Sequence, residues 1–219
     1  VGSGLTAISV ATGNSATCAL LSDHSVKCWG KNNVGQLGLG NSSSNDVLTP
    51  HTVTFNGAST PLSLHAGRNE FCAQLDNGSA ACWGQNADGQ FGLGNTTSQT
   101  SPIALTLPTG RTIASMNMAK DFICITLDNG SVVCAGRNTE FQIGQGTTST
   151  AELSWKYVIG LDMVAHSVEL GQDVGCAHLV NGSMACWGED VWGLFGNSTT
   201  SYTSRVASTA TQYANFGNG

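Results

Sequence analysis

The chain has 219 residues, of which only 10% are charged, and its formal net charge is −6. That charged share is well below the roughly 25% of ordinary soluble proteins. The sequence has no cluster of Lys and Arg, which argues against binding to DNA, RNA or an anionic lipid surface. No apolar stretch approaches the ~20 residues of a membrane span. Because the chain starts at Val1 and not at methionine, we expect a processed protein or a piece of a longer one.

All eight cysteines fall into four pairs, and the two members of each pair are ten positions apart. The pairs are Cys18 and Cys28, Cys72 and Cys82, Cys124 and Cys134, and Cys176 and Cys186. The pairs recur at intervals of 54, 52 and 52 residues, and a period of this size is typical of a repeat protein. We therefore expect a single repeat domain over residues 1–219, with repeats at approximately 5–57, 58–109, 110–161 and 162–214.

Each repeat opens with a segment in which apolar and polar residues alternate. In chain order these segments are AISVATG, LSLHAG, IASMNMA and HSVELG. One repeat position is apolar throughout and is filled by Val10, Leu64, Met116 and Val168. Another position, five residues before the first cysteine, holds Gly13, Gly67, Ala119 and Gly171, whose small size suggests close backbone approach. Alternation with a period of two predicts β-strands, and no segment shows a helical pattern with caps.

A tight turn separates the two cysteines of each pair. In the second repeat, Asp76 and Asn77 fit the centre of a type I turn and Gly78 fits the left-handed residue that follows it. This is a three-residue hairpin loop with a bulge at glycine, and it places Cys72 opposite Cys82. The third and fourth repeats have the same turn, whereas the first has the poorer sequence Asp23-His24-Ser25.

The hairpin register selects one disulfide pairing. Directly opposed residues in an antiparallel ladder are roughly 4.5–5.5 Å apart at Cα, and a disulfide accepts roughly 4.4–6.8 Å. We therefore predict the bridges Cys18–Cys28, Cys72–Cys82, Cys124–Cys134 and Cys176–Cys186, each contributing on the order of 2–3 kcal/mol in the entropic model. The alternatives are free thiols in a cytosolic protein and a zinc site. The absence of Cys-x-x-Cys, and histidines that do not track the cysteines, disfavour zinc.

Disulfides in every repeat imply an oxidising compartment, so we expect an extracellular or cell-surface location. Sequons of the form Asn-x-Ser/Thr agree with this expectation. Three of them, Asn41, Asn95 and Asn197, follow a glycine run and are predicted on exposed loop tips that accept N-glycans. The other three, Asn77, Asn129 and Asn181, lie in the hairpin turns, where turn chemistry already explains asparagine.

A glycine-rich signature follows the second cysteine of each pair. The first two repeats read Trp29-Gly30 and Trp83-Gly84, followed by GQLGLG and GQFGLG. With the hairpin, this unit closely resembles the repeat of the regulator of chromosome condensation family, over roughly residues 5–207. The third repeat departs from it, with Ala135 in place of tryptophan. The fourth keeps Trp187 but is two residues short before its sequon.

The resemblance implies a β-propeller in which each repeat supplies one small antiparallel sheet. Trp29, Trp83 and Trp187 would then pack between blades. The expected fold is all-β, a propeller-like array of four antiparallel blades. Family propellers have more blades than this. Three arrangements therefore remain open: part of a longer protein, a small closed ring, or an open array whose ends pair with the next copy.

No catalytic motif or calcium loop is present, and we predict neither an enzyme nor a cofactor nor a metal site. The best-known members of the family are nuclear exchange factors for a small GTPase that also bind chromatin. Disulfides in every repeat do not fit the nucleus, and we predict no nucleic-acid partner. Propellers of this family that work outside the cell bind proteins across one face.

We therefore expect an extracellular structural or adhesive protein, with head-to-tail assembly into a fibre as one form. Its partners would be proteins, or copies of itself. The alternative is a secreted binding module that recognises a protein or carbohydrate through one propeller face. Trp155 and Trp192 depart from the repeat pattern. They are candidate partner contacts, or local packing that compensates for drifted repeats.

Overall fold

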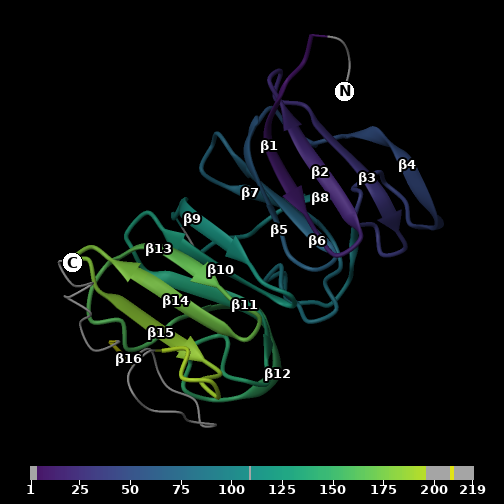
Figure 1. Ribbon diagram of the computed structural model, residues 1–219. Coiled ribbons are helices and arrows are strands. Elements are labelled where there is room, and N and C mark those ends of the chain that lie inside the picture. Colours follow the sequence, from purple (N-terminus) through teal and green to yellow (C-terminus); the bar gives the residue numbers. More distant parts are fainter. Residues whose placement is uncertain (1–3, 109, 196–207, 210–219) are drawn as a thin grey trace, which may run out of the picture.

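The computed structural model describes residues 4–108, 110–195 and 208–209. These residues form four antiparallel sheets of four strands each, paired in chain order (Figure 1). Blade 1 consists of β1 (Ala7–Thr12), β2 (Ala16–Leu21), β3 (Val26–Asn32) and β4 (Ser43–Val53). Blade 2 consists of β5 (Pro61–Ala66), β6 (Glu70–Leu75), β7 (Ala80–Gly84) and β8 (Gln99–Ala104).

The second half of the chain repeats this plan. Blade 3 consists of β9 (Ile113–Met118), β10 (Phe122–Leu127), β11 (Val132–Asn138) and β12 (Ser149–Tyr157). Blade 4 consists of β13 (Ala165–Leu170), β14 (Val174–Leu179), β15 (Met184–Gly188) and β16 (Ser208–Thr209). None of the described segments is a helix of the length and apolarity that crossing a membrane requires. The fold is the expected all-β, propeller-like array of four antiparallel blades.

The first strands of neighbouring blades lie side by side: β1 beside β5, β5 beside β9, and β9 beside β13. The four sheets therefore spread outward from one inner set of strands, as propeller blades do. In Figure 1, blade 1 and blade 4 lie at opposite ends of the array.

The hairpin turns have the predicted geometry. Gly78, Gly130 and Gly182 have φ angles of 77°, 77° and 82°. In blade 1 the same position is taken by His24, with a φ of 64°. A residue other than glycine rarely adopts this conformation. Asp23 supports the turn, because its carboxylate accepts hydrogen bonds from the hydroxyl and the backbone N–H of Ser25, at 2.7 and 3.0 Å.

The ladder registers place the two cysteines of each pair opposite one another. The structure joins them as Cys18–Cys28, Cys72–Cys82, Cys124–Cys134 and Cys176–Cys186. The Cα atoms are 4.1 Å apart in every pair, slightly closer than the ladder spacing predicts. No cysteine is free.

The hydrophobic core lies between the blades. Each sheet has an outgoing face, which carries its disulfide, and an incoming face, which carries the tryptophan position of the repeat. The first core cluster joins Cys18 and Cys28 of blade 1 to Leu64 and Trp83 of blade 2. Two further clusters join blade 2 to blade 3 and blade 3 to blade 4 in the same way. Every disulfide in these three seams is therefore buried by the next blade.

Two of the three repeat tryptophans pack between blades as expected. Trp83 and Trp187 are fully buried, and their indole N–H groups donate to the backbone carbonyls of Gln36 and Gln142, at 3.1 and 2.8 Å. Trp29 differs, because it lies on the incoming face of blade 1, which no blade precedes within this chain. It is only partly buried.

A buried polar side chain organises each glycine run. The side-chain oxygen of Asn86 accepts a hydrogen bond from the backbone N–H of Phe91 at 3.0 Å, and its amide donates to the carbonyls of Asn95 and Thr97. Asn32, Asn138 and Asp190 accept the equivalent bond at the same position of the other blades. An Asn in blades 1 to 3, and Asp190 in blade 4, thus holds the loop of the glycine run in each blade.

Candidate functional site

The turns after the four inner strands converge around an open hollow of about 610 Å³. All four blades contribute to its lining. The small residues of the repeat, Gly13, Gly67, Ala119 and Gly171, lie there and let the turns approach closely. At Gly67 a Cβ atom would fall 2.5 Å from the carbonyl oxygen of Ala119 in blade 3, so the close approach predicted from sequence is real.

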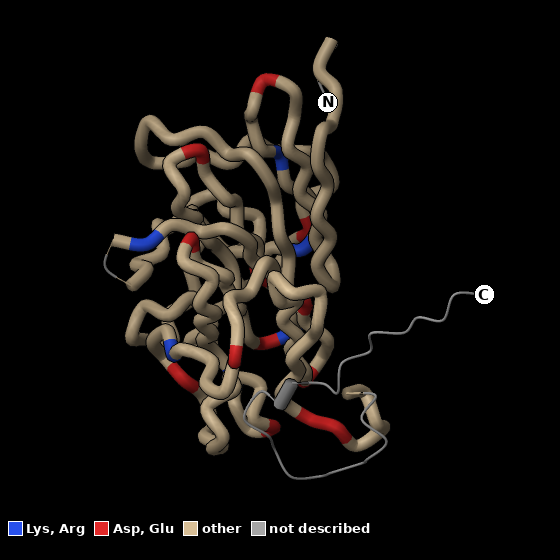
Figure 2. Tube along the Cα trace, turned by 90° about the vertical axis from the view of Figure 1, so that its left-hand side faces the viewer, with Lys and Arg blue, Asp and Glu red and all other residues tan. Residues whose placement is uncertain are grey.

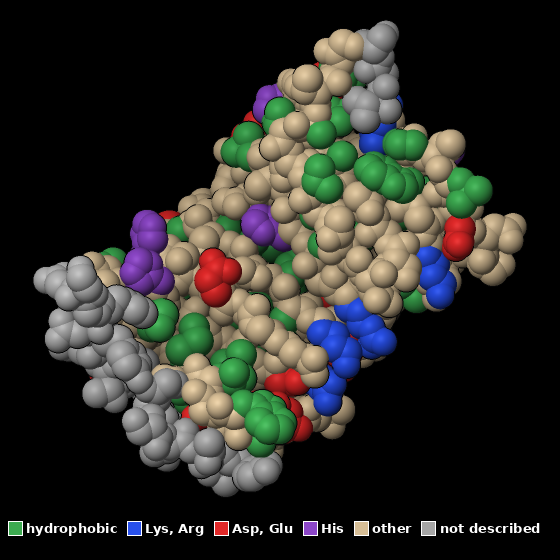
Figure 3. Space-filling model, in the orientation of Figure 1, with side chains coloured by type: hydrophobic (Ala, Val, Ile, Leu, Met, Phe, Trp, Pro, Cys, Tyr) green, Lys and Arg blue, Asp and Glu red, His purple; other side chains and the backbone are tan. Residues whose placement is uncertain are grey.

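The residue after each small residue is polar and lines the same hollow. These residues are Asn14, Arg68, Lys120 and Gln172, one from each blade. Two of the eight Lys and Arg residues of an acidic chain therefore lie at one hollow. Elsewhere the charges are scattered along the trace (Figure 2). In Figure 3 blue side chains gather on the face where blades 2 and 3 meet.

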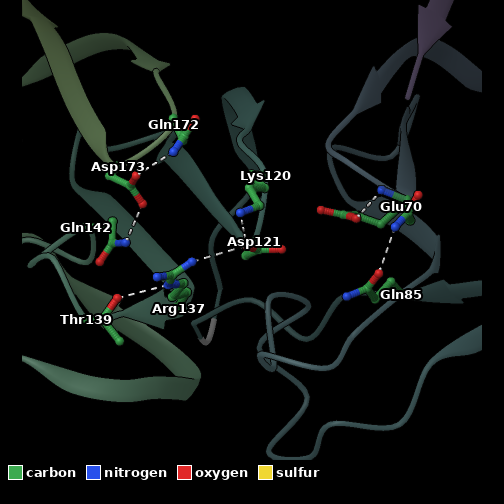
Figure 4. A network of polar contacts seen from close by, with 10 residues as sticks. Glu70, Gln85, Lys120, Asp121, Arg137, Thr139, Gln142, Gln172 and Asp173 are labelled. Carbon is green, nitrogen blue, oxygen red and sulfur yellow. Dashed lines mark hydrogen bonds and ion pairs between the residues drawn. The ribbon is translucent and has the colours of Figure 1, made fainter. Parts of the chain in front are cut away.

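Polar contacts lie behind this rim in blades 2, 3 and 4, in separate groups (Figure 4). Asp121 pairs with Lys120 and with Arg137, with N–O distances of 3.7 Å in both cases. Asp173 of blade 4 accepts a hydrogen bond from the side chain of Gln142 of blade 3 at 2.9 Å, and another from Gln172 at 3.1 Å. Of these contacts, the one between Gln142 and Asp173 joins blade 3 to blade 4.

Glu70 is the most unusual member of this region. It is fully buried at the start of β6, and its side chain points toward Asp121 (Figure 4). One carboxylate oxygen accepts the backbone N–H of Asn69 at 2.8 Å, whereas the other has no hydrogen-bond partner. Burial, with a smaller contribution from the negative charge of Asp121, raises the pKa of Glu70 to about 8. Glu70 is therefore largely a neutral acid at pH 7.

The hollow presents groups that can bind a partner. Among the described residues, no three His, Cys, Asp or Glu side chains lie together as metal ligands. The hollow is wide and open, and it offers two cations, two amides and the backbone of four turns. Such a surface can contact a partner by charge and hydrogen bonding.

The five sequon asparagines within the described residues are all exposed. Asn41 and Asn95 lie on loops beyond the glycine runs. Asn77 and Asn181 instead accept hydrogen bonds from the hydroxyl of the serine two residues later, at 2.6 and 2.7 Å. Asn129 accepts a hydrogen bond from the backbone N–H of Ser131, also two residues later. Asn197 lies outside the described residues.

The two tryptophans off the repeat pattern have different surroundings. Trp155 packs against Gly92 and Leu93 in the seam between blades 2 and 3, and its indole nitrogen is buried. For Trp155 this contact fits local packing, the second of the two roles considered from the sequence. Trp192 is 82% exposed and lines a small pocket on blade 4 with Leu194 and Val174.

Sequence reasoning missed Glu70 and the network around it. A signal was available, because the same repeat position holds Ala16, Phe122 and Val174 in the other blades. An acidic residue at an otherwise apolar position marks a buried ionisable group. The rim of one polar residue per blade also follows directly from the repeat alignment.

Comparisons with known proteins agree with this architecture. Models of the regulator of chromosome condensation (RCC1) repeat match residues 7–36, 23–73 and 77–125. The protein RCC2 homolog of Xenopus laevis is 30% identical over 164 residues, which cover 74% of this chain and 30% of that protein.

Solved structures share the fold at low sequence identity. Human WBSCR16 superposes with a TM-score of 0.78 and 20% identity, covering 92% of this chain and 52% of that one. Yeast RCC1 (Prp20), solved bound to Kap60, superposes with a TM-score of 0.64 and 17% identity, covering 97% of this chain and 62% of that one. The chain thus spans less than two thirds of each of these relatives. Because models of this repeat match more than half of the chain, the chain belongs to the regulator of chromosome condensation repeat family.

Proposed function

We propose that this chain is a non-catalytic extracellular protein with a structural or adhesive role, built of disulfide-strapped and N-glycosylated blades. The observation that supports it most is the use of all eight cysteines in disulfides, one within each blade. Proteins of the cytosol and nucleus are kept reduced and rarely use disulfides as routine struts. The exposed sequons at Asn41 and Asn95 fit the same compartment.

The partners proposed are proteins, including further copies of the chain. Yeast RCC1 has been solved bound to the protein Kap60, which supports protein recognition by this kind of propeller. We do not transfer that partner.

Glycosylation during secretion tests the proposed compartment. The chain is expressed through the secretory route of eukaryotic cells, and its intact mass is measured with and without deglycosidase. Ser43→Ala and Thr97→Ala remove the sequons of Asn41 and Asn95 and should each remove one glycan. Ser42→Ala and Thr96→Ala are matched controls that keep the sequons. Secreted protein with the unmodified mass would contradict the proposal.

A second function is favoured by the hollow. The chain would be a secreted binding module whose rim residues Arg68 and Lys120 contact an acidic segment of a protein or an acidic carbohydrate. Titration with polyglutamate or heparin tests this. Binding should weaken with salt and with Arg68→Ala or Lys120→Ala, but not with Lys31→Ala, which removes a cation that does not line the hollow. Equal loss in all three variants would contradict a specific site.

A further inference from the structure

The carboxyl group of Glu70 lies directly behind the lining of the hollow. Gly67 lines the hollow, and a Cβ atom on Gly67 would fall 2.3 Å from Oε1 of Glu70. The same Cβ would fall 2.5 Å from the carbonyl oxygen of Ala119, which also lines the hollow. Glu70 itself is fully buried. An ionisable group that does not reach solvent is therefore packed against the backbone of the binding surface.

The same carboxyl group holds the turn that carries one of the two cations of the rim. Its second oxygen accepts the backbone N–H of Asn69 at 2.8 Å, and Asn69 follows Arg68 directly. Among the described residues, no carboxylate lies within ion-pair distance of Arg68. The positive charge of Arg68 is thus free to act on a ligand, and a negative charge on Glu70 would oppose it.

Charges of both signs face Glu70 from the elements packed around it. Lys120 and Asp121 lie in the turn between β9 and β10, Arg137 lies on β11, and Asp88 lies in the loop after β7. Lys120 and Arg137 both pair with Asp121, at 3.7 Å in each case (Figure 4). The two nearby cations are therefore already engaged, and an ionised Glu70 would have no cation of its own.

The surroundings of Glu70 also lack hydrogen-bond donors for a second negative charge. Its Oε1 atom has no hydrogen-bond partner. Burial, and to a smaller degree the charge of Asp121, raises the pKa of Glu70 to about 8. Arg68 and Lys120 keep their charges well above this pH, because the ordinary pKa values of arginine and lysine lie above 10. Glu70 thus changes its charge while the two cations of the rim do not.

We propose that Glu70 is the pH-sensing residue of the hollow, and that its ionisation weakens the hold of Arg68 and Lys120 on an anionic ligand. The inference rests on the binding module proposed above as the second function, and it adds the regulation of that site. The ligand is recognised by its anionic groups, carboxylates or sulfates. Coupling between two sites is reciprocal, so a bound anion must favour the neutral form of Glu70.

Binding measured at pH 7 and pH 9, at one low ionic strength, tests the coupling. Polyglutamate and heparin are the probes, and both stay ionised over this range. Each should bind on the order of fivefold more weakly at pH 9. Glu70→Gln is neutral at both pH values and should remove this difference. Asp46→Asn is the matched control, because it removes a carboxylate from the exposed strand β4, outside the hollow, and should leave the difference unchanged.

Proton uptake provides an independent readout. Isothermal titration calorimetry at pH 8 is carried out in two buffers of different ionisation enthalpy. Because a bound anion favours the neutral acid, binding should draw part of a proton from the buffer. Glu70→Gln should remove that uptake. Uptake that is the same in the wild-type chain and in Glu70→Gln would contradict the proposal.

The outcomes separate the regulation from the binding itself. A chain that binds neither probe at pH 7 overturns the binding module. Equal affinities at pH 7 and pH 9, a difference that persists in Glu70→Gln, or a difference confined to one probe overturns only the role of Glu70. Asp121→Asn is the second variant. It removes a negative charge that raises the pKa of Glu70, so the midpoint of the pH dependence should move to lower pH, and an unmoved midpoint would count against the proposal.

Discussion

The indole of Trp155 lies directly against Gly92, where a Cβ atom would fall 2.5 Å from its Cε2. Trp83 lies against Gly38 and Trp187 against Gly144 in the same manner. Both of those tryptophans belong to the third strand of their blade, whereas Trp155 comes from the outer strand β12. Trp155 supplies the aromatic ring in the seam between blades 2 and 3, where Ala135 replaces the repeat tryptophan. The third blade thus packs against blade 2 through Trp155 and not through a tryptophan at position 135.

Gly92→Ala should destabilise the chain more than Gly94→Ala. Both glycines have positive φ angles, 64° and 75°, so both substitutions carry backbone strain of about 1 kcal/mol. Only Gly92 also meets an indole, because a Cβ at Gly94 has nothing within 4 Å. The difference between the two urea midpoints isolates the contact with Trp155. Equal midpoints would contradict the packing described.

Trp155→Ala should lower the free energy of unfolding by about 2–4 kcal/mol, because it opens a cavity in the seam between blades 2 and 3. Adding Ala135→Trp should recover part of this loss, since it restores the aromatic position of the other blades. Denaturant unfolding of the single and double variants measures the recovery. If the double variant is less stable than Trp155→Ala alone, Trp155 does not stand in for the missing ring.

Glu70 makes the stability of the chain depend on pH. Its pKa of about 8 in the folded chain lies above the usual 4.5, so the folded state keeps a proton that the unfolded state loses. The stability that this proton provides is complete below about pH 4.5 and is lost as the pH rises toward 8.

Glu70→Gln should therefore flatten the fall in stability between these pH values and should raise the melting temperature at pH 8. Each tenfold change in proton affinity is worth about 1.4 kcal/mol, so the gain is readily measured. Asp121→Asn is the companion variant, and it should lower the pKa of Glu70 by removing a nearby negative charge. A slope unchanged by Glu70→Gln would show that another group controls the dependence.

The buried cap Asn86 should tolerate aspartate better than alanine. Asn86→Ala leaves the buried N–H of Phe91 without a partner, at a cost of about 1–3 kcal/mol, and also removes the bonds to the carbonyls of Asn95 and Thr97. Asn86→Asp keeps the acceptor, as Asp190 does in blade 4. Thermal unfolding compares the two variants, and equal melting temperatures would contradict the capping role.

The hairpins could be predicted from sequence because their geometry is local. The turn at Gly78 fixes the register, and the register alone brings Cys72 opposite Cys82. The seams could be predicted only in part. The sequence shows that Ala135 replaces the repeat tryptophan. It does not show that Trp155 packs against Gly92, because these two residues belong to different blades and lie far apart along the chain.

The most direct measurement is thiol labelling of the secreted chain before and after reduction. Iodoacetamide should label none of the eight cysteines in the native, unreduced protein and all eight after reduction. A peptide map of the unreduced protein should join Cys18 to Cys28 and each later pair likewise. Bridges between different blades, or thiols that react without reductant, would contradict an extracellular protein whose blades are each strapped by their own disulfide.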